Sequence, residues 1–134
     1  MVDGGFDPLH AGHVEYFRAA TGFGCPVLCN ITSDAYLSRK HPPLLPAEQR
    51  VVVIDAIRYI DFTHIAGDLS TADVLGRLQP RYYVKGEDWR GRLPSEELAV
   101  CERYGIEVAF VATMIDSSTR ILDRYVSSRE SRCA

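Results

Sequence analysis

Short runs rich in β-branched and aromatic residues alternate with helical patterns along almost the whole of this chain. A first, very short run at residues 1–3 precedes Gly4. The remaining strand candidates, all bounded by Gly, Pro or polar residues, are 26–31, 61–66, 81–85 and 107–111. Because strands that alternate with helices form parallel sheets covered on both faces, this order restricts the chain to a layered α/β fold.

Helical periodicity fills the intervals between these strands. Apolar residues fall on one face of a helix over residues 11–21. Pro46 stands where a first-turn proline opens a well-buried helix that continues through residues 51–60. Three further helices are expected around Val74 and Leu75, around Leu98 and Cys101, and around Ile121 and Leu122. We therefore expect a Rossmann-like, three-layer α/β/α fold with a central five-stranded parallel sheet.

Length and composition narrow the class of protein further. The 134 residues fit a single domain over 1–134, with a polar tail at 127–134 that frays. A net charge of -3 argues against a nucleic-acid binder. No apolar stretch approaches the roughly 20 residues that span a bilayer, and no secretory signal is visible at the N-terminus. The four cysteines fit reduced thiols. We expect a cytoplasmic protein with no membrane or nucleic-acid partner.

The segment at residues 4–13, with the letters GGFDPLHAGH, follows the first strand and leads into the first helix. Its glycines allow a tight turn, and the helix start offers unpaired N–H groups to a phosphate. His10 and His13 are three residues apart, so both imidazoles can face one bound group. The segment is neither a dinucleotide fingerprint nor a Walker P-loop. Two imidazoles at a helix start suit the stabilisation of charge on a phosphate under in-line attack.

This segment also fits a known pattern, G-x-F-D-x-x-H-x-G-H. The pattern resembles the signature of the cytidylyltransferase-like nucleotidyltransferase superfamily, in which the H-x-G-H pair binds the phosphates of a nucleoside triphosphate. Four further stretches resemble family motifs and occur in the same order, at residues 33–36, 48–61, 84–89 and 117–121. The resemblance covers nearly the whole chain and implies a nucleotidyltransferase that uses a triphosphate with Mg²⁺ bound to it.

The resemblance assigns roles to individual residues. His10 and His13 are implied to be catalytic. The loop after the strand 81–85 is implied to hold the nucleotide base and part of the acceptor, with Asp88 accepting a hydrogen bond and Trp89 stacking. Ser117 opens the last helix, where a Ser/Thr start both caps the helix and offers donors to phosphate. The expected nucleotide-binding residues are Gly5, Phe6, Asp7, Gly12, Lys85, Gly86, Asp88, Trp89, Ser117, Ser118 and Thr119.

Basic residues outside these motifs are candidates for the second substrate. Arg39 and Lys40 follow the second strand in a stretch that can fold over the triphosphate, and we assign Lys40 to catalysis. Arg50 and Arg58 lie on the helix after Pro46, and a guanidinium suits an acceptor phosphate. The expected acceptor-binding residues are therefore Arg39, Arg50 and Arg58. Because the I-R-Y-I-D match resembles glycerol-3-phosphate cytidylyltransferases, Arg58 is also assigned to catalysis.

The identity of the nucleotide stays open between CTP and ATP. The loop at residues 87–92 resembles that of glycerol-3-phosphate cytidylyltransferases, and we favour transfer of CMP on this ground. Cytidylyltransferases of that group carry R-T-x-G-I-S-T before the last helix, whereas this chain has Ala112 in place of the arginine and Ile115 in place of the glycine. The adenylyltransferase domain of bifunctional heptose enzymes also lacks that arginine, so transfer of AMP to a sugar phosphate is the alternative. A non-catalytic nucleotide-binding domain is a third reading.

The expected reaction follows from these residues. An oxygen of a phosphorylated small alcohol or sugar attacks the α-phosphorus, and pyrophosphate leaves. Because a phosphate nucleophile is already ionised at neutral pH, catalysis rests on positioning and charge stabilisation. Apolar side chains on the helix through residues 51–60 suggest a homodimer.

Overall fold

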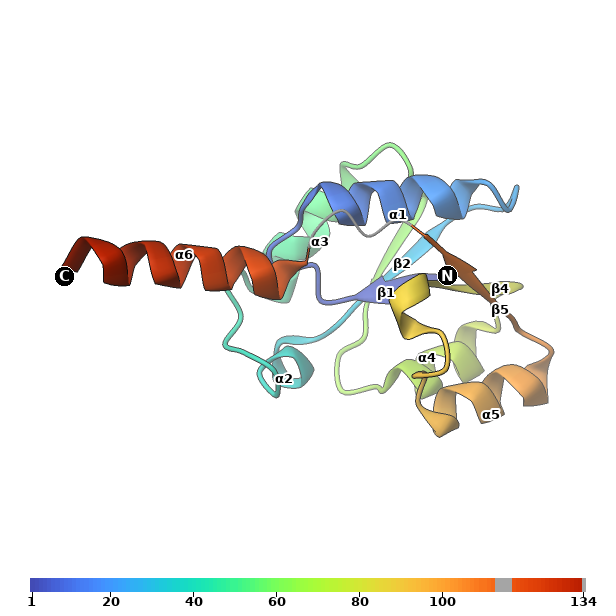
Figure 1. Cartoon of the computed structure of the whole chain (residues 1–134). Coiled ribbons are helices and arrows are strands. Elements are labelled where there is room, and N and C mark those ends of the chain that lie inside the picture. The colour runs from blue at the N-terminus through green and yellow to red at the C-terminus, as the bar shows by residue number, and fades with distance from the viewer. Residues whose placement is uncertain (113–116, 134) are drawn as a thin grey trace.

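The computed structural model describes residues 1–112 and 117–133, and strands alternate with helices through them (Figure 1). The strands are β1 (Val2–Gly4), β2 (Leu28–Ile31), β3 (Phe62–Ile65), β4 (Tyr82–Gly86) and β5 (Glu107–Val111). The helices are α1 (Ala11–Thr21), α2 (Asp34–Leu37), α3 (Ala47–Asp55), α4 (Thr71–Leu78), the 3₁₀ turn η1 (Glu87–Trp89), α5 (Ser95–Tyr104) and α6 (Ser118–Cys133). The α/β class is confirmed.

The strands pair in parallel but do not form the expected single five-stranded sheet. β1, β2 and β3 make one sheet in that order, and β4 pairs with β5 in a second. The two sheets meet at Met1, whose amine donates to Tyr82 O (2.6 Å) and whose carbonyl accepts from Val84 N (2.9 Å). Both of these backbone hydrogen bonds come from Met1, directly ahead of β1, whereas Asp3 of β1 contacts β4 through side chains.

Helices cover both faces of the strands. Figure 1 shows α1 and α3 on one side, and α4 and α5 on the other. Val2, Phe17 and Ile54 belong to the core cluster on the α1 and α3 side. Leu75 and Tyr83 belong to the second cluster, on the α4 and α5 side. The three-layer arrangement therefore follows from apolar residues that face opposite sides of the strands.

The helix α3 is shorter than the sequence predicts. It ends at Asp55, and Ile57 N then bonds to Ile54 O (3.0 Å) while Ile60 N bonds to Ile57 O (3.0 Å). These bonds span three residues instead of four, so the chain tightens and leaves the helix. The expected helix through residue 60 is wrong in its second half, and Arg58 lies in an exposed turn instead.

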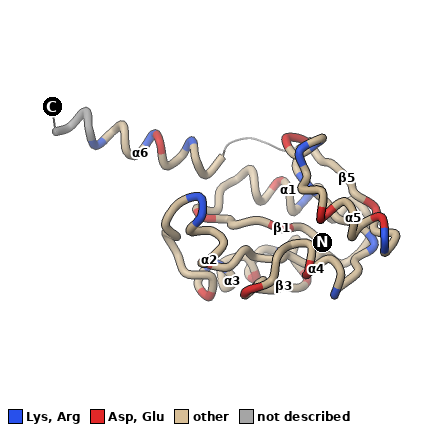
Figure 2. The backbone as a smooth tube through the Cα atoms, turned by 90° about the horizontal axis from the view of Figure 1, so that it is seen from below, with Lys and Arg blue, Asp and Glu red and all other residues tan. Residues whose placement is uncertain are grey.

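The last helix, α6, extends away from the rest of the molecule in both Figure 1 and Figure 2. Ser117 caps it, with its hydroxyl accepting from Arg120 N (3.2 Å). The helix continues to Cys133, where the sequence predicts a frayed tail from residue 127. No Gly or Pro interrupts residues 118–133, so the helical hydrogen bonds can continue to that point. None of the helices in the described part of the chain is long and apolar enough to cross a membrane.

Candidate active site

A cavity of about 240 Å³ opens at the carboxyl ends of β1 and β4. This is the edge where ligands bind in open parallel sheets, because loops leave the strands there and enter helices. The cavity brings together three sequence segments that the motifs singled out. Its walls are formed by Asp3, Gly4, Gly5, Phe6, His10, Gly12, His13, Tyr16, Lys40, Lys85, Gly86, Asp88, Trp89, Ser117 and Ser118.

The two histidines stand at the start of α1 with their rings stacked. The ring centroids of His10 and His13 are 3.8 Å apart, with an interplanar angle of 25°. His10 is the N-cap of α1, and its Nδ1 accepts from Gly12 N (3.1 Å). Because Nδ1 is the acceptor, the hydrogen of neutral His10 lies on Nε2. The expected position of both imidazoles at a helix start is confirmed.

His13 is uncharged in this site at neutral pH. Burial, with a smaller contribution from His10, lowers the pKa of His13 from its ordinary 6.5 to about 3. Its Nδ1 is shielded from solvent and has no hydrogen-bond partner among the described residues. Buried polar atoms are normally paired, so an unpaired nitrogen in a cavity wall suits a ligand group. A bound polyphosphate would raise the pKa of His13, because a nearby negative charge favours the imidazolium.

The turn between β1 and α1 has a constrained backbone. Phe6 has φ 53°, in the left-handed region that non-glycine residues rarely adopt. Its ring packs edge-on against His13, with centroids 5.0 Å apart, and against Phe17, with centroids 5.1 Å apart. A Cβ at Gly5 would lie 2.8 Å from Leu37 Cδ1, so a larger residue there would require the buried Leu37 side chain to shift. The turn and its packing together fix the position of His13.

Asp7 and Arg50 hold the backbone around the site and do not line the cavity. Asp7 is 2% exposed, and its carboxylate accepts from Leu44 N (2.6 Å) and Leu45 N (3.2 Å). Arg50 is 1% exposed and donates to Leu45 O (2.9 Å) and Gly5 O (2.8 Å).

Arg50 also reaches β2 and α2. It donates to Thr32 O (2.8 Å) and pairs with Asp34 (2.6 Å). These contacts use four of the five N–H groups of the guanidinium. The structure therefore gives Asp7 and Arg50 a holding role, in place of the nucleotide and acceptor contacts that the sequence predicts.

The other basic candidates separate into two groups. Lys40 lines the cavity, with its Nζ 5.8 Å from the centroid of the Trp89 ring. Arg39 lies beside it, stacked on Tyr36 at 4.2 Å. Arg58 is exposed and does not line the cavity, because α3 ends before it.

Thr119, an expected nucleotide-binding residue, is also exposed, one residue beyond the part of α6 that faces the cavity.

A second cavity, of about 640 Å³, adjoins the first and was not foreseen from the sequence. Lys40, Lys85 and Trp89 line both cavities. The second cavity extends toward α2, α4 and α5. Its further polar lining includes Asn30, Thr32, Ser33, Tyr36, Arg39, Ser70, Thr71, Glu96 and Glu97.

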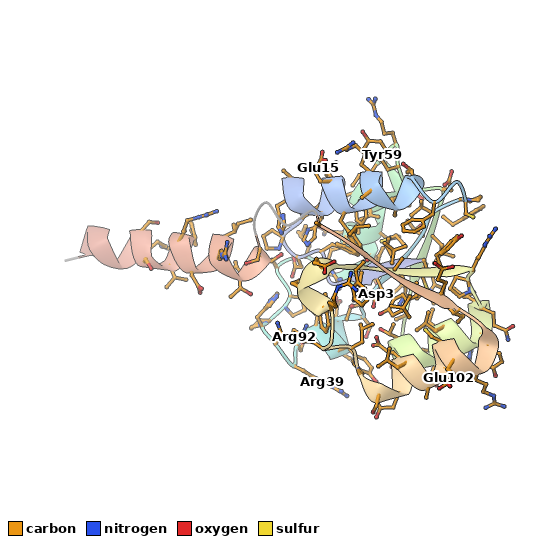
Figure 3. All side chains as sticks on the ribbon, turned by 45° about the vertical axis from the view of Figure 1, so that its right-hand side comes forward. Asp3, Glu15, Arg39, Tyr59, Arg92 and Glu102 are labelled. Atoms are coloured by element: carbon orange, nitrogen blue, oxygen red, sulfur yellow. The ribbon has the colours of Figure 1, made fainter. Side chains whose placement is uncertain are left out.

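Asp3 is the main site residue that sequence reasoning missed. It lies inside the fold (Figure 3), and its carboxylate pairs with Lys85 Nζ at 2.7 Å, where each side chain is 8% exposed. Thr71 and Tyr83 also donate to it, each over 3.2 Å. Tyr16 is a second missed residue, and its hydroxyl donates to Val84 O. The sequence does carry a signal that could have identified Asp3. It is an acidic residue in the first strand, directly ahead of the glycines that form the turn.

The segment at residues 113–116 lies outside the described residues. The replacement of a family glycine by Ile115 falls there. Ala112, which replaces the family arginine, is exposed directly after β5. The cavity wall in the described part of this region comes from Ser117 and Ser118, and Ser118 Oγ donates to Pro8 O (2.9 Å).

Comparison with known proteins gives matches along the chain. A family model described as cytidylyltransferase-like matches residues 1–124. The bifunctional protein HldE of Geotalea uraniireducens is 34% identical over 130 residues, which cover 92% of this chain and 26% of HldE. HldE of Geobacter sulfurreducens is 32% identical, with 96% and 27% covered. The chain thus spans about a quarter of the length of these relatives.

Two other similarities concern shorter proteins. FAD synthase of Pyrococcus horikoshii is 36% identical over 92 residues, which cover 66% of this chain and 62% of that enzyme. A crystal structure described as a lipopolysaccharide core biosynthesis protein from Thermoplasma volcanium superposes with a TM-score of 0.73. It shares 19% identity, with 85% of this chain and 95% of that chain covered, and so supports the fold alone.

Proposed function

Because the chain belongs to the cytidylyltransferase-like family, we propose that it is a nucleotidyltransferase that moves a nucleoside monophosphate onto a small phosphorylated acceptor and releases pyrophosphate. The observation that carries this proposal is the convergence of His10, His13, Lys85 and Ser118 on one cavity. These are two imidazoles, a cation and a helix start, and each suits the stabilisation of charge on phosphate oxygens.

The nucleotide we propose is ATP. The relatives include an enzyme named for making FAD, a product that contains an adenylyl group. Ala112 stands where cytidylyltransferases of the glycerol-3-phosphate group carry arginine, a departure shared with the adenylyltransferase domain of heptose enzymes. CTP is the second candidate, because the loop at residues 87–92 resembles that of the glycerol-3-phosphate group.

The first cavity suits the triphosphate. His10 and His13 face the phosphates, and Lys40 and Lys85 add positive charge to balance the leaving pyrophosphate. Mg²⁺ commonly binds through substrate phosphates and one or two carboxylates, and it would supply charge neutralisation. The residues present fit this, because Asp88 places one carboxylate in the wall beside donors suited to phosphate oxygens.

The second cavity suits the acceptor. It adjoins the first along Lys40, Lys85 and Trp89, so an acceptor held there can reach the triphosphate. Arg39 and Lys40 can hold the acceptor phosphate, whose ionised oxygen attacks the α-phosphorus. No protein base is needed for such a nucleophile, so the side chains act by positioning and charge.

Trp89 offers a direct test of nucleotide binding. It is the one tryptophan of the chain and lines both cavities, so its fluorescence should change when a nucleotide binds. We expect MgATP to change this signal at lower concentration than MgCTP. His13→Ala should abolish pyrophosphate release, whereas His41→Ala, a histidine outside both cavities, should retain it. Unchanged fluorescence with both nucleotides would contradict the proposal.

A further inference from the structure

A tyrosine hydroxyl lies between two carboxylates that line the second cavity. Tyr83 is 0% exposed, and its hydroxyl lies 3.2 Å from Asp3 Oδ1 and 3.0 Å from Glu97 Oε2. The three side chains come from β1, β4 and α5, far apart in sequence. Asp3 and Glu97 both line the second cavity.

Two full hydrogen bonds at the Tyr83 oxygen need two hydrogens, and the hydroxyl has one. Burial and the neighbouring carboxylates raise the pKa of Tyr83 far above its ordinary range, so the hydroxyl keeps its proton. With both carboxyls ionised, this one hydrogen is split between two acceptors. With one carboxyl protonated, that carboxyl donates to the tyrosine oxygen, and each contact has its own hydrogen. The geometry therefore favours one additional proton in the cluster.

The surroundings indicate which carboxyl carries this proton. Asp3 is ion-paired with Lys85 over 2.7 Å and accepts from Thr71, so its oxygens already have donors. Glu97 forms no ion pair within the described part of the chain and is half-buried. Burial first, and then the charge of Asp3, raise the pKa of Glu97 above its ordinary 4.5.

The charged and titratable groups around Glu97 come from several elements. Asp3 on β1 and Glu96 on α5 favour its protonation, while Tyr83 and Lys85 on β4 oppose it. Two others lie near the cluster. Cys101 on α5 has its own pKa raised, by burial and then by the charge of Glu97, and Tyr16 on α1 contributes to the raised pKa of Tyr83.

We propose that Glu97 is a positioning residue that acts as a neutral acid, whose proton completes a chain from Glu97 through Tyr83 and Asp3 to Lys85. This rests on the proposed function, because Lys85 is taken there to contact the triphosphate. Lys85 lines both cavities, and its Nζ lies 4.4 Å from the centroid of the Trp89 ring. With Glu97 neutral, Tyr83 donates to Asp3, and Asp3 holds Lys85 at one place between the two substrates.

Loss of the proton changes what holds Lys85. When Glu97 ionises, its proton leaves to solvent and two carboxylates compete for the single hydrogen of Tyr83. Asp3 then shares the Tyr83 hydroxyl with Glu97. The negative charge of Glu97 also attracts Lys85 toward α5. The ammonium is thereby drawn away from the triphosphate. Nucleotide affinity should fall as the pH rises through the raised pKa of Glu97.

The same proton affects stability in a defined direction. Because folding raises the pKa of Glu97, the folded protein binds this proton more tightly than the unfolded chain. The contribution of Glu97 to the free energy of unfolding is fully present below its ordinary pKa of 4.5. This contribution is lost as the pH rises through the raised pKa of Glu97 in the folded protein. Glu97→Gln keeps a neutral hydrogen-bond donor and removes the ionisation.

The experiment compares the unaltered protein with Glu97→Gln, Tyr83→Phe and Glu102→Gln over a pH series. Glu102 is an exposed glutamate on the same helix (Figure 3) and serves as the matched control. For the unaltered protein we expect KM for ATP to rise several-fold across the transition, with kcat changing less. Glu97→Gln should flatten this rise, Tyr83→Phe should weaken it, and Glu102→Gln should reproduce it.

Thermal unfolding without nucleotide gives a second, independent measurement. The Tm of the unaltered protein should fall with rising pH relative to that of Glu97→Gln over the same range. Identical pH dependence of Tm and KM in both proteins would overturn the proposal. If no pyrophosphate is released by the unaltered protein, the proposed function fails, while the Tm comparison still decides whether Glu97 holds the proton.

Discussion

Arg50 offers the sharpest test of how the site is built, through the substitution Arg50→Met. Methionine fills much of the same volume but donates no hydrogen bonds. The guanidinium is 1% exposed and bonds to the carbonyls of Gly5, Thr32 and Leu45 and to the carboxylate of Asp34. The substitution therefore leaves three carbonyls without this donor and one carboxylate without its partner.

The expected loss of stability follows from these contacts. Hydrogen bonds from a charged group are worth about 1.5–3 kcal/mol each, so three carbonyls alone set an upper range of roughly 4.5–9 kcal/mol. Two effects reduce it. The Asp34 side chain is 42% exposed and regains water, and removal of Arg50 also removes the cost of burying a charge. We expect a net loss of about 3–5 kcal/mol, which comes mainly from the three carbonyl oxygens left without a donor.

Urea unfolding followed by Trp89 fluorescence measures this loss. Arg58→Met is the matched control, because Arg58 is an exposed arginine eight positions further along the chain. It should change the free energy of unfolding by less than about 0.5 kcal/mol. A loss below about 1 kcal/mol for Arg50→Met would refute the holding role, because three carbonyl oxygens and a carboxylate would then have lost their donor at almost no cost in stability.

Three further predictions follow from the site. Asp7→Ala removes the acceptor for Leu44 N and Leu45 N, so it should lower the free energy of unfolding in urea by about 1–3 kcal/mol. It should also raise KM for the nucleotide, because the segment that carries Lys40 is held less firmly. An unchanged KM would contradict the link between Asp7 and Lys40. In NMR titration of the free protein, His13 should stay neutral until the pH nears 3, and MgATP should raise its pKa. Because folding lowers this pKa, the contribution of neutral His13 to stability is fully present above pH 6.5 and is lost as the pH falls toward 3. A pKa near 6.5 in the free protein would contradict the buried, unpaired environment described for His13. Gly86→Ala places a Cβ against the carboxylate of Asp88, so it should weaken nucleotide binding, measured by Trp89 fluorescence, while changing Tm little. Unaltered binding would show that nucleotide binding does not require this position of the Asp88 carboxylate.

The elements that sequence could predict are those fixed by local pattern. The alternation of strand and helix signals located the five strands of the described residues, because hydrophobic periodicity is a property of neighbouring residues. The position of His10 and His13 followed for the same reason, since a glycine turn and a helix start lie within one short segment. Lys85 and Ser118 joined the same cavity because parallel strands place their carboxyl ends at one edge.

The features that sequence could not predict depend on distant partners. Arg50 and Arg58 both follow the same proline in the sequence. Arg50 lies within α3 and is buried, whereas Arg58 lies beyond the end of α3 and is exposed in a turn. The cluster of Asp3, Tyr83 and Glu97 exists only once β1 lies beside β4 and α5 covers both. The break between the two sheets at Met1 depends likewise on how few residues of β1 meet β4.

The central claim is tested most directly by identifying the product that forms when the protein is mixed with magnesium, ATP or CTP, and a panel of phosphorylated alcohols and sugars. Mass spectrometry and a pyrophosphate assay report the two products together. We expect one nucleotidylated acceptor, formed from ATP in a one-to-one ratio with pyrophosphate and absent with His13→Ala. Formation from CTP alone would correct the nucleotide. No product with any pairing, together with unchanged Trp89 fluorescence, would contradict the assignment of this cavity to nucleotidyl transfer.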